Sequence, residues 1–327
     1  MLDRRKFVTL SGASLAGPYL LSARAQAAEW PSKEVRIVVG FEGGGATDII
    51  ARALADRLKA VWNQPVTVEN KPGAGGNVAA EQVVKAPPDG HTIFIAGPGQ
   101  ALNTFMYPKL GYDPVHDFAP VSLLVMQPNV MAVPVSSPVR SVKDFIDACK
   151  ANPGKETYAS SGVGTSLHLC GLLFQHLTGV RMEHVPFKGS AAALLEFLPG
   201  RIDVIFDNVT SILPHVMSGG ARGLAVTTTK RIAADPKLPT LIESGVPGFD
   251  VSSWFGFWVP AKTPQEIVAK MNKDVVAALG HDQVRPKLIG LGCEIVGSTP
   301  QALEAHLKSE MAKWGPIIKD AKIQLEN

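Results

Sequence analysis

The sequence predicts an α/β fold of two lobes, and two observations support this prediction. Short runs of β-branched residues alternate with segments whose apolar residues recur at helical spacing, a pattern typical of α/β folds with largely parallel sheets. Two stretches, 121–134 and 235–250, lack helical periodicity and have the composition expected of crossings between lobes. Two crossings allow a pair of lobes to open and close around a cleft. We therefore expect lobe 1 over residues 28–125 and 250–327, and lobe 2 over residues 126–249.

The first strand and helix set the pattern for the rest of the chain. Residues 35–39 read as a strand that runs into a glycine-rich turn, and Ile50, Leu54 and Leu58 then recur on one face of a helix. A further helix is expected from residue 77 and another from residue 166. Further strands are expected at 66–69, 92–96, 157–159, 182–185, 202–206, 224–226 and 255–259.

The first 27 residues have the features of an export signal. Arg4 and Arg5 precede an apolar stretch over residues 7–21, and Ala25-Gln26-Ala27 fits the pattern that signal peptidase accepts. The paired arginines resemble a twin-arginine signal, while an ordinary secretory signal is the alternative. We expect cleavage after Ala27 and a periplasmic mature chain.

Composition excludes several classes of protein. The 327 residues are 46% hydrophobic and 19% charged, which is too apolar and too mixed for a disordered chain. Removing the predicted signal takes away four basic residues and one acidic residue, so the formal charge falls from +3 to zero. A neutral chain without a basic stripe argues against a nucleic-acid partner.

The three cysteines, Cys149, Cys170 and Cys293, have no metal-ligand spacing. Buried free thiols are the default interpretation, and a Cys149–Cys170 disulfide is the alternative in an oxidising compartment. We expect no cofactor and no metal.

Several predicted strands end in turns rich in Gly, Ser, Thr or Asn that lead straight into helices. Such turns line the crevice at the carboxyl ends of strands in open α/β sheets, where the first N–H groups of each helix favour an anion. A single turn of this kind is more often an ordinary N-cap than a site, and the occurrence of five of them favours a site. The turns are 43–48, 73–77, 160–166, 188–190 and 207–208.

Known enzymatic motifs are missing from these turns. The first glycine turn has neither the Lys-Ser/Thr pair of a P-loop nor the spacing of a dinucleotide fingerprint, and no G-x-S-x-G or H-E-x-x-H motif occurs. The remaining catalytic hypothesis is an exported serine hydrolase that uses Ser160 or Ser166 with His168.

The order of the motifs resembles the Bug family, the periplasmic substrate-binding proteins of tripartite tricarboxylate transporters (TctC-like). The resemblance covers nearly the whole mature chain, and the motifs are specific through their number and order. They comprise Trp30-Pro31, residues 41–48, Val68 to Gly76, Tyr112-Asp113-Pro114, Asp117 to Val121, Ala151 to Lys155, Tyr158 to Ser166 with His168, Val185 to Ser190, Asp203 to Asn208 and Gly245 to Phe249.

This resemblance implies a type II periplasmic-binding-protein fold whose lobes clamp a small organic carboxylate and deliver it to membrane permease subunits. A ligand-sensing receptor with a membrane signalling partner is the alternative, and a monomer is expected in either case. In the family the carboxylate is held by turns rather than by an arginine clamp. The resulting candidate ligand-binding residues are Phe41, Glu42, Gly44, Gly45, Asp48, Gly76, Asn77, Gly97, Gly99, Gln100, Ser160, Ser161, Gly164, Thr165, His168, Lys188 and Asp207.

Glu42 departs from the family pattern, which has a small residue or proline after the aromatic residue of the first turn. A carboxylate that faces an anionic ligand is repulsive unless a donor on the ligand meets it. Glu42 therefore either points to solvent or receives a hydroxyl or amino group of the ligand.

Overall fold

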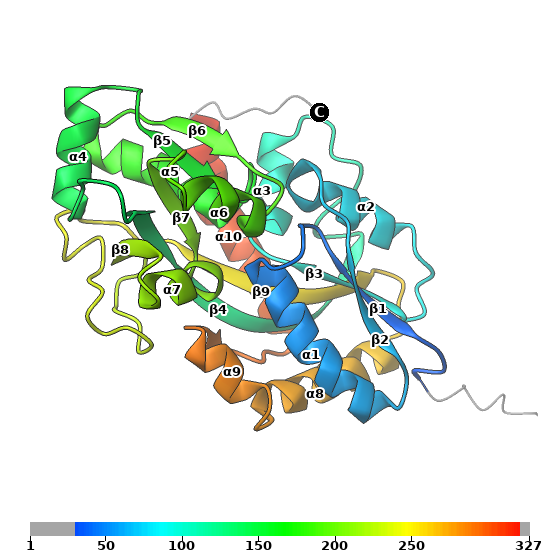
Figure 1. The fold of residues 1–327 in the computed structure, drawn as a ribbon. Coiled ribbons are helices and arrows are strands. Elements are labelled where there is room, and N and C mark those ends of the chain that lie inside the picture. Colours follow the sequence, from blue (N-terminus) through cyan, green and yellow to red (C-terminus); the bar gives the residue numbers. More distant parts are fainter. Residues whose placement is uncertain (1–29, 321–327) are drawn as a thin grey trace, which may run out of the picture.

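The computed structural model describes residues 30–320, and the predicted export signal lies outside them. Ten strands form one continuous sheet with the order β2-β1-β3-β9-β4-β7-β5-β6, while β10 and β8 also pair with β4 (Figure 1). The strands are Val35–Val39 (β1), Val66–Asn70 (β2), Thr92–Ala96 (β3), Phe118–Pro134 (β4), Thr157–Ser160 (β5), Glu183–Pro186 (β6), Val204–Asn208 (β7), Ala221–Val226 (β8), Ser252–Pro260 (β9) and Glu294–Ile295 (β10).

Ten α-helices and one short 3₁₀ helix cover the described part of the sheet. They are Ala46–Trp62 (α1), Ala74–Gly76 (η1), Asn77–Val84 (α2), Gly99–Met106 (α3), Val142–Ala151 (α4), Ser166–Thr178 (α5), Ser190–Phe197 (α6), Val209–Met217 (α7), Gln265–Gly280 (α8), Arg285–Gly290 (α9) and Pro300–Asp320 (α10). Within residues 30–320, none of them combines the length and the apolar run that a membrane crossing requires.

The sheet has helices on both faces in each half. Alternate residues of β1 point to opposite faces, so Val35 and Ile37 join the core beneath α1 and α8, while Val38 joins the core beneath α2, α3 and α10. In the other half, α4 and α5 cover one face and α6 and α7 the other. The α/β fold class is therefore confirmed.

The prediction of largely parallel sheets is wrong for the middle of the molecule. The pairs β1–β2, β1–β3, β5–β6 and β5–β7 are parallel, whereas β4 pairs antiparallel with β9, β7, β8 and β10. The strand β4 leaves the first half, and β9 re-enters that half beside it in the opposite direction, so β4 and β9 pair antiparallel. The sheet is mixed for this reason.

The first crossing is β4 itself. It pairs with β9 as far as Pro128 and with β7 and β8 from Asn129 onward, so one strand belongs to both halves. We retain the predicted lobes as a proposal, with this crossing beside their first boundary.

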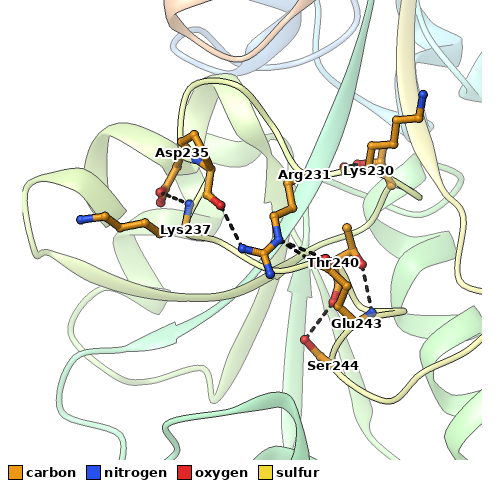
Figure 2. Close-up of polar contacts among 9 residues, drawn as sticks. Lys230, Arg231, Asp235, Lys237, Thr240, Glu243 and Ser244 are labelled. Atoms are coloured by element: carbon orange, nitrogen blue, oxygen red, sulfur yellow. Dashed lines mark hydrogen bonds and ion pairs between the residues drawn. The ribbon is translucent and has the colours of Figure 1, made fainter.

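The second crossing is the connection between β8 and β9, residues 227–251. Arg231 organises it: Nε lies 2.9 Å from a carboxylate oxygen of Glu243, and Nη1 donates to the carbonyl of Pro236 at 3.0 Å. Thr240 and Glu243 exchange backbone-to-side-chain hydrogen bonds of 2.8 and 3.0 Å. Figure 2 shows these contacts, which give this segment without helix or strand a defined shape.

The cysteine alternative is wrong: Cys149, Cys170 and Cys293 are all free and buried. Cys149 belongs to the buried face of α4, and the thiol of Cys170 accepts a hydrogen bond from Asn129 Nδ2 at 3.2 Å. The thiols therefore lie at separate buried positions and form no disulfide.

Candidate binding cleft

A cavity that is partly open to solvent lies between the two halves at the carboxyl ends of the parallel strands. Three strand–turn–helix connections from each half meet there: β1, β2 and β3 lead to α1, α2 and α3, and β5, β6 and β7 lead to α5, α6 and α7. The residues that cap these helices are Gly45, Gly76, Pro98, Thr165, Gly189 and Asn208.

All of these caps except Gly189 line the cavity, and Ser190 lines it next to Gly189. The first N–H groups of a helix have no partner within the helix and carry the positive end of its dipole. Among the described residues that line the cavity there is no Lys or Arg, whereas Glu42 and Asp48 are acidic. Any attraction for an anion therefore comes from neutral donors.

The structure places ten of the predicted residues on the cavity wall, and ligand contact by each of them remains a prediction. These are Phe41, Glu42, Gly45, Asp48, Gly76, Gly97, Gly99, Gln100, Ser161 and Thr165.

The other seven predicted residues lie behind the wall or beside it. The N–H of Gly44 is bound to Asp48, and Asn77 lies under the wall, where its Oδ1 accepts from Asn103 and Tyr112. The side chain of Lys188 is exposed, and its carbonyl accepts the N–H of Glu42 at 3.1 Å. Ser160, Gly164, His168 and Asp207 are buried outside the lining set.

Asp48 holds the first turn in place. Its carboxylate accepts from the N–H of Gly44 at 3.0 Å, from Arg52 Nε at 2.9 Å and from Asn70 Nδ2 at 3.0 Å. Burial raises the pKa of Asp48, but the hydrogen bonds from Arg52, Gly44 and Asn70 outweigh burial and leave the pKa below its usual value. Asp48 is therefore an ionised brace for the glycine turn.

The floor of the cavity is a polar cluster that joins β4 and β9 to β7 and α5. Asn208 Nδ2 donates to Asn129 Oδ1 and to Ser253 Oγ, both at 2.6 Å, and Ser253 Oγ donates to Asn129 Oδ1 at 2.9 Å. Ser166 Oγ is hydrogen-bonded to Ser253 Oγ. The hydroxyls of Ser166 and Ser253 are thus engaged within the protein.

Asp207 lies directly behind this floor and is fully buried. Its Oδ1 accepts from Ser190 Oγ at 2.5 Å and from the N–H of Asn208 at 2.8 Å, while its Oδ2 has no hydrogen-bond partner within the described residues. Burial raises the pKa of Asp207 to about 7, although the bonds from Ser190 and Asn208 act in the opposite direction.

A stack of rings lies behind the turn formed by residues 160–165. The ring of His184 stacks on His168 with centroids 4.3 Å apart and on Tyr158 at 4.7 Å. Burial lowers the pKa of His168 to about 3 and that of His184 to about 4, so both rings are neutral at neutral pH. Within residues 30–320, no three His, Cys, Asp or Glu side chains are grouped closely enough to hold a metal ion.

The serine–histidine pairing in the structure differs from the one that the hydrolase hypothesis requires. Ser160 Oγ lies 2.7 Å from Nε2 of His184, not of His168, and Ser160 is fully buried. Ser166 is bonded to Ser253, and His168 Nδ1 accepts the N–H of Gly164 at 3.4 Å. The cavity wall therefore presents neither of the two proposed serine–histidine pairs.

Sequence reasoning missed several residues that line the cavity. Ser253 and Phe255 belong to β9, where the sequence shows an apolar strand with no following turn. A Ser in an otherwise apolar run is the one signal that could have pointed to Ser253. Asn103 and Tyr112 reach the cavity through tertiary packing. Thr47, Ser166, Ser190 and Asn208 lie in the predicted turns but were not among the candidate residues, and they also line the cavity. The lining residues outside every predicted turn are Gly40, Phe94, Ile95, Ala96, Asn103, Tyr112, Ser253 and Phe255.

The two halves touch across the mouth of the cleft. Besides the bond between Glu42 and Lys188, Gly75 faces the carbonyl of Val163 so closely that an added Cβ at Gly75 would lie 2.7 Å from that oxygen. The structure therefore has its halves closed on each other.

Fold and cleft together define a solute receptor with two lobes, in which helix N-termini from both halves face one cavity. The sequence places the chain more narrowly: residues 50–323 match the family described as "Tripartite tricarboxylate transporter family receptor". The chain belongs to this family, which confirms the family resemblance predicted from the motifs.

Three relatives illustrate the similarity. The chain is 30% identical to protein BugT of Bordetella pertussis over 94% of each chain. It is 40% identical to the Rpa4515 protein of R. palustris, solved with adipate, with a TM-score of 0.88 over 91% of this chain and all of that one. It is 32% identical to MatC of Rhodopseudomonas palustris, solved with malate, with a TM-score of 0.84 over 88% of this chain and all of that one.

Proposed function

We propose that this protein is a non-catalytic periplasmic receptor that closes over a small organic carboxylate and delivers it to a tripartite tricarboxylate-type transporter. The observation that carries the proposal is the meeting of six helix N-termini at one cavity whose wall has no basic side chain among the described residues. The relatives solved with adipate and with malate support a carboxylate as the ligand class. The export signal predicted over residues 1–27 supports the periplasmic location.

The free donors of the wall indicate where the anion binds. Thr47 and Ser161 line the cavity, and within residues 30–320 their hydroxyls make no hydrogen bond to the protein. Thr47 lies in the first turn of α1, where the hydroxyl and the helix N–H groups can act on the same ligand group. We assign these two hydroxyls to the carboxylate of the ligand.

The test is a thermal-shift screen of the mature protein against carboxylates, beginning with adipate and malate. A ligand at about 100 times its Kd adds roughly 2.7 kcal/mol to stability. Thr47→Val removes a donor to a charged group, which is worth roughly 1.5–3 kcal/mol, so affinity should fall at least tenfold. Thr67→Val, at an exposed position on β2, is the matched control and should leave affinity unchanged. No stabilisation by any carboxylate would refute the proposal.

A second experiment tests whether Glu42 contacts a hydroxyl or amino group of the ligand. Its side chain is half-buried at the cavity lining, so both interpretations of its role remain. If it points to solvent, Glu42→Ala leaves affinity nearly unchanged for every acid. If it receives a donor, Glu42→Ala weakens hydroxy- and amino-substituted acids selectively, and calorimetry with malate and an unsubstituted dicarboxylate of the same length separates the two outcomes.

A further inference from the structure

The carboxylate of Asp207 is buried directly behind the proposed anion site, where a negative charge would disfavour an anionic ligand. Asp207 is fully buried, one of its oxygens has no partner within the described residues, and no ion pair neutralises it there. The residues that bond to its other oxygen, Ser190 and Asn208, both line the cavity. An ionised Asp207 therefore repels the ligand that the site is built to hold.

The hydroxyl of Ser190 links this carboxylate to the cavity. An ionised carboxylate accepts hydrogen bonds only, so with Asp207 ionised the Ser190 O–H must point at Asp207 and its lone pairs are left for the cavity. A protonated Asp207 can donate to Ser190 Oγ instead, and the Ser190 O–H is then free to turn to an anion. The protonation of Asp207 thus decides whether Ser190 attracts or repels the ligand.

We infer that Asp207 takes up one proton from solvent when a carboxylate enters the cleft, and that Ser190 is the ligand donor whose direction this proton sets. The inference rests on the proposed function and adds to it a positioning residue and a linkage between binding and pH. The raised pKa of Asp207, about 7, supports it because protonation at neutral pH then has little cost.

The ionisable groups on the neighbouring elements do not replace this proton. The strand β4, which pairs with β7 beside Asp207, has no ionisable side chain. Tyr158 of β5, His168, Cys170 and His176 of α5, Glu196 of α6 and His215 of α7 form no bond to Asp207, and neither do Glu42, Asp48, Lys188 or His184 across or beside the cleft. Burial keeps Tyr158 and Cys170 protonated and His168 and His184 neutral throughout the range of the test.

The first test measures adipate and malate binding by calorimetry from about pH 6 to pH 9, where both ligands stay ionised. We expect Kd to rise roughly tenfold per pH unit above about pH 7.5, and close to one proton to be taken up per ligand near pH 8 in buffers of different ionisation enthalpy. A Kd that does not change over this range, with no proton uptake, overturns the inference while leaving the carboxylate receptor intact. Absence of binding at every pH refutes the receptor proposal instead.

Variants distinguish the coupling between ligand binding and protonation of Asp207 from structural effects of a substitution. Asp207→Asn removes the charge and places an N–H donor beside Ser190, so at about pH 9 it should bind at least tenfold more tightly than the wild type and show a flat pH profile. Asp203→Asn, four residues earlier and bonded to Thr157 away from the cavity, should keep the wild-type slope. Weaker binding by Asp207→Asn at pH 9 contradicts the inference.

Two further measurements keep the test decisive if Asp207→Asn does not fold. Ser190→Ala should weaken binding about tenfold near pH 6 and reduce the pH slope, whereas wild-type affinity in this variant would show that Ser190 is no donor. In the free protein, a ¹³C carboxyl titration should show one aspartate that titrates near pH 7. If every aspartate remains ionised down to about pH 5, the proton is not available and the inference fails.

Discussion

Asp48, in the first turn of α1, and Asp207, near the end of β7, lie in opposite halves of the molecule beside one cleft, and their carboxylates have different surroundings. Asp48 receives a guanidinium, an amide and a backbone N–H, and its pKa is lowered despite burial. Asp207 receives one hydroxyl and one N–H, without a cation, and burial raises its pKa to about 7. The wall formed by lobe 1 therefore has a fixed charge that holds a turn, whereas lobe 2 has, behind its wall, a group whose charge depends on pH.

The largest expected effect concerns the stability cost of Asp207. Its folded pKa is raised, so its contribution to stability is fully present below about pH 4 and is lost as pH rises through about 7. The variant Asp207→Asn has no carboxyl group to ionise, so it does not lose this stability. In urea titrations, the free energy of unfolding of the variant minus that of the wild type should increase by on the order of 3 kcal/mol between about pH 4 and pH 8. If this difference in unfolding free energy stays constant between about pH 4 and pH 8, Asp207 does not titrate in that range, and the contrast with Asp48 fails.

The histidine stack should show the opposite dependence within the same lobe. His184 has a lowered folded pKa of about 4, so its contribution is fully present above the unfolded pKa of about 6.5 and is lost as pH falls through that range. His184→Gln should therefore be less stable than the wild type near pH 7, by about 2 kcal/mol, and this deficit should shrink toward pH 4. Acid unfolding followed by tryptophan fluorescence measures the change, and a deficit that grows toward pH 4 contradicts it.

Removing the brace in lobe 1 should destabilise the turn at every pH above about 5. Asp48→Ala leaves the N–H of Gly44 and the side chains of Arg52 and Asn70 without their shared acceptor. We expect a loss of about 2 kcal/mol in the free energy of unfolding, reduced from the value for a buried pair because Arg52 is half exposed. Asp56→Ala, at an exposed position on the same helix, should change stability by less than about 0.5 kcal/mol.

The smallest expected effect tests the contact between the walls. Gly164 has a φ of +82°, and an added Cβ would clash with Asn103 from the opposite half. Gly154 has a φ of +77° with nothing within 4 Å of an added Cβ. Gly164→Ala and Gly154→Ala should therefore share a backbone cost of about 1 kcal/mol, but only Gly164→Ala should weaken adipate binding, by about tenfold. Equal affinities would show that closure does not bring these residues together.

The sequence predicted individual strands and helices better than the pairing of the strands in the sheet. Strand periodicity and glycine turns located β1, β3 and the starts of α1, α2, α5, α6 and α7, because these signals are local. The antiparallel middle of the sheet was missed, since the partner of a strand such as β4 depends on residues more than a hundred positions away.

The residues of the candidate site also fall into those that a local motif predicts and those that tertiary packing places. The turn residues Gly45, Gly76 and Thr165 were predictable from their place between a strand and a helix. Ser253 and Asn103 were not, because they reach the cavity through packing rather than through a local motif. The difference between Asp48 and Asp207 was also beyond the sequence, since it depends on which side chains surround each carboxylate.

The pairing of β4 determines how the two halves can separate. This strand of 17 residues pairs with β9 and β10 as far as Pro128 and with β7 and β8 from Asn129 onward. Any rotation of one half against the other must therefore be absorbed as torsion of paired strands near this proline, rather than as a swing about a loose tether. Such a joint resists deformation elastically, so the opened form should return to the same closed register each time.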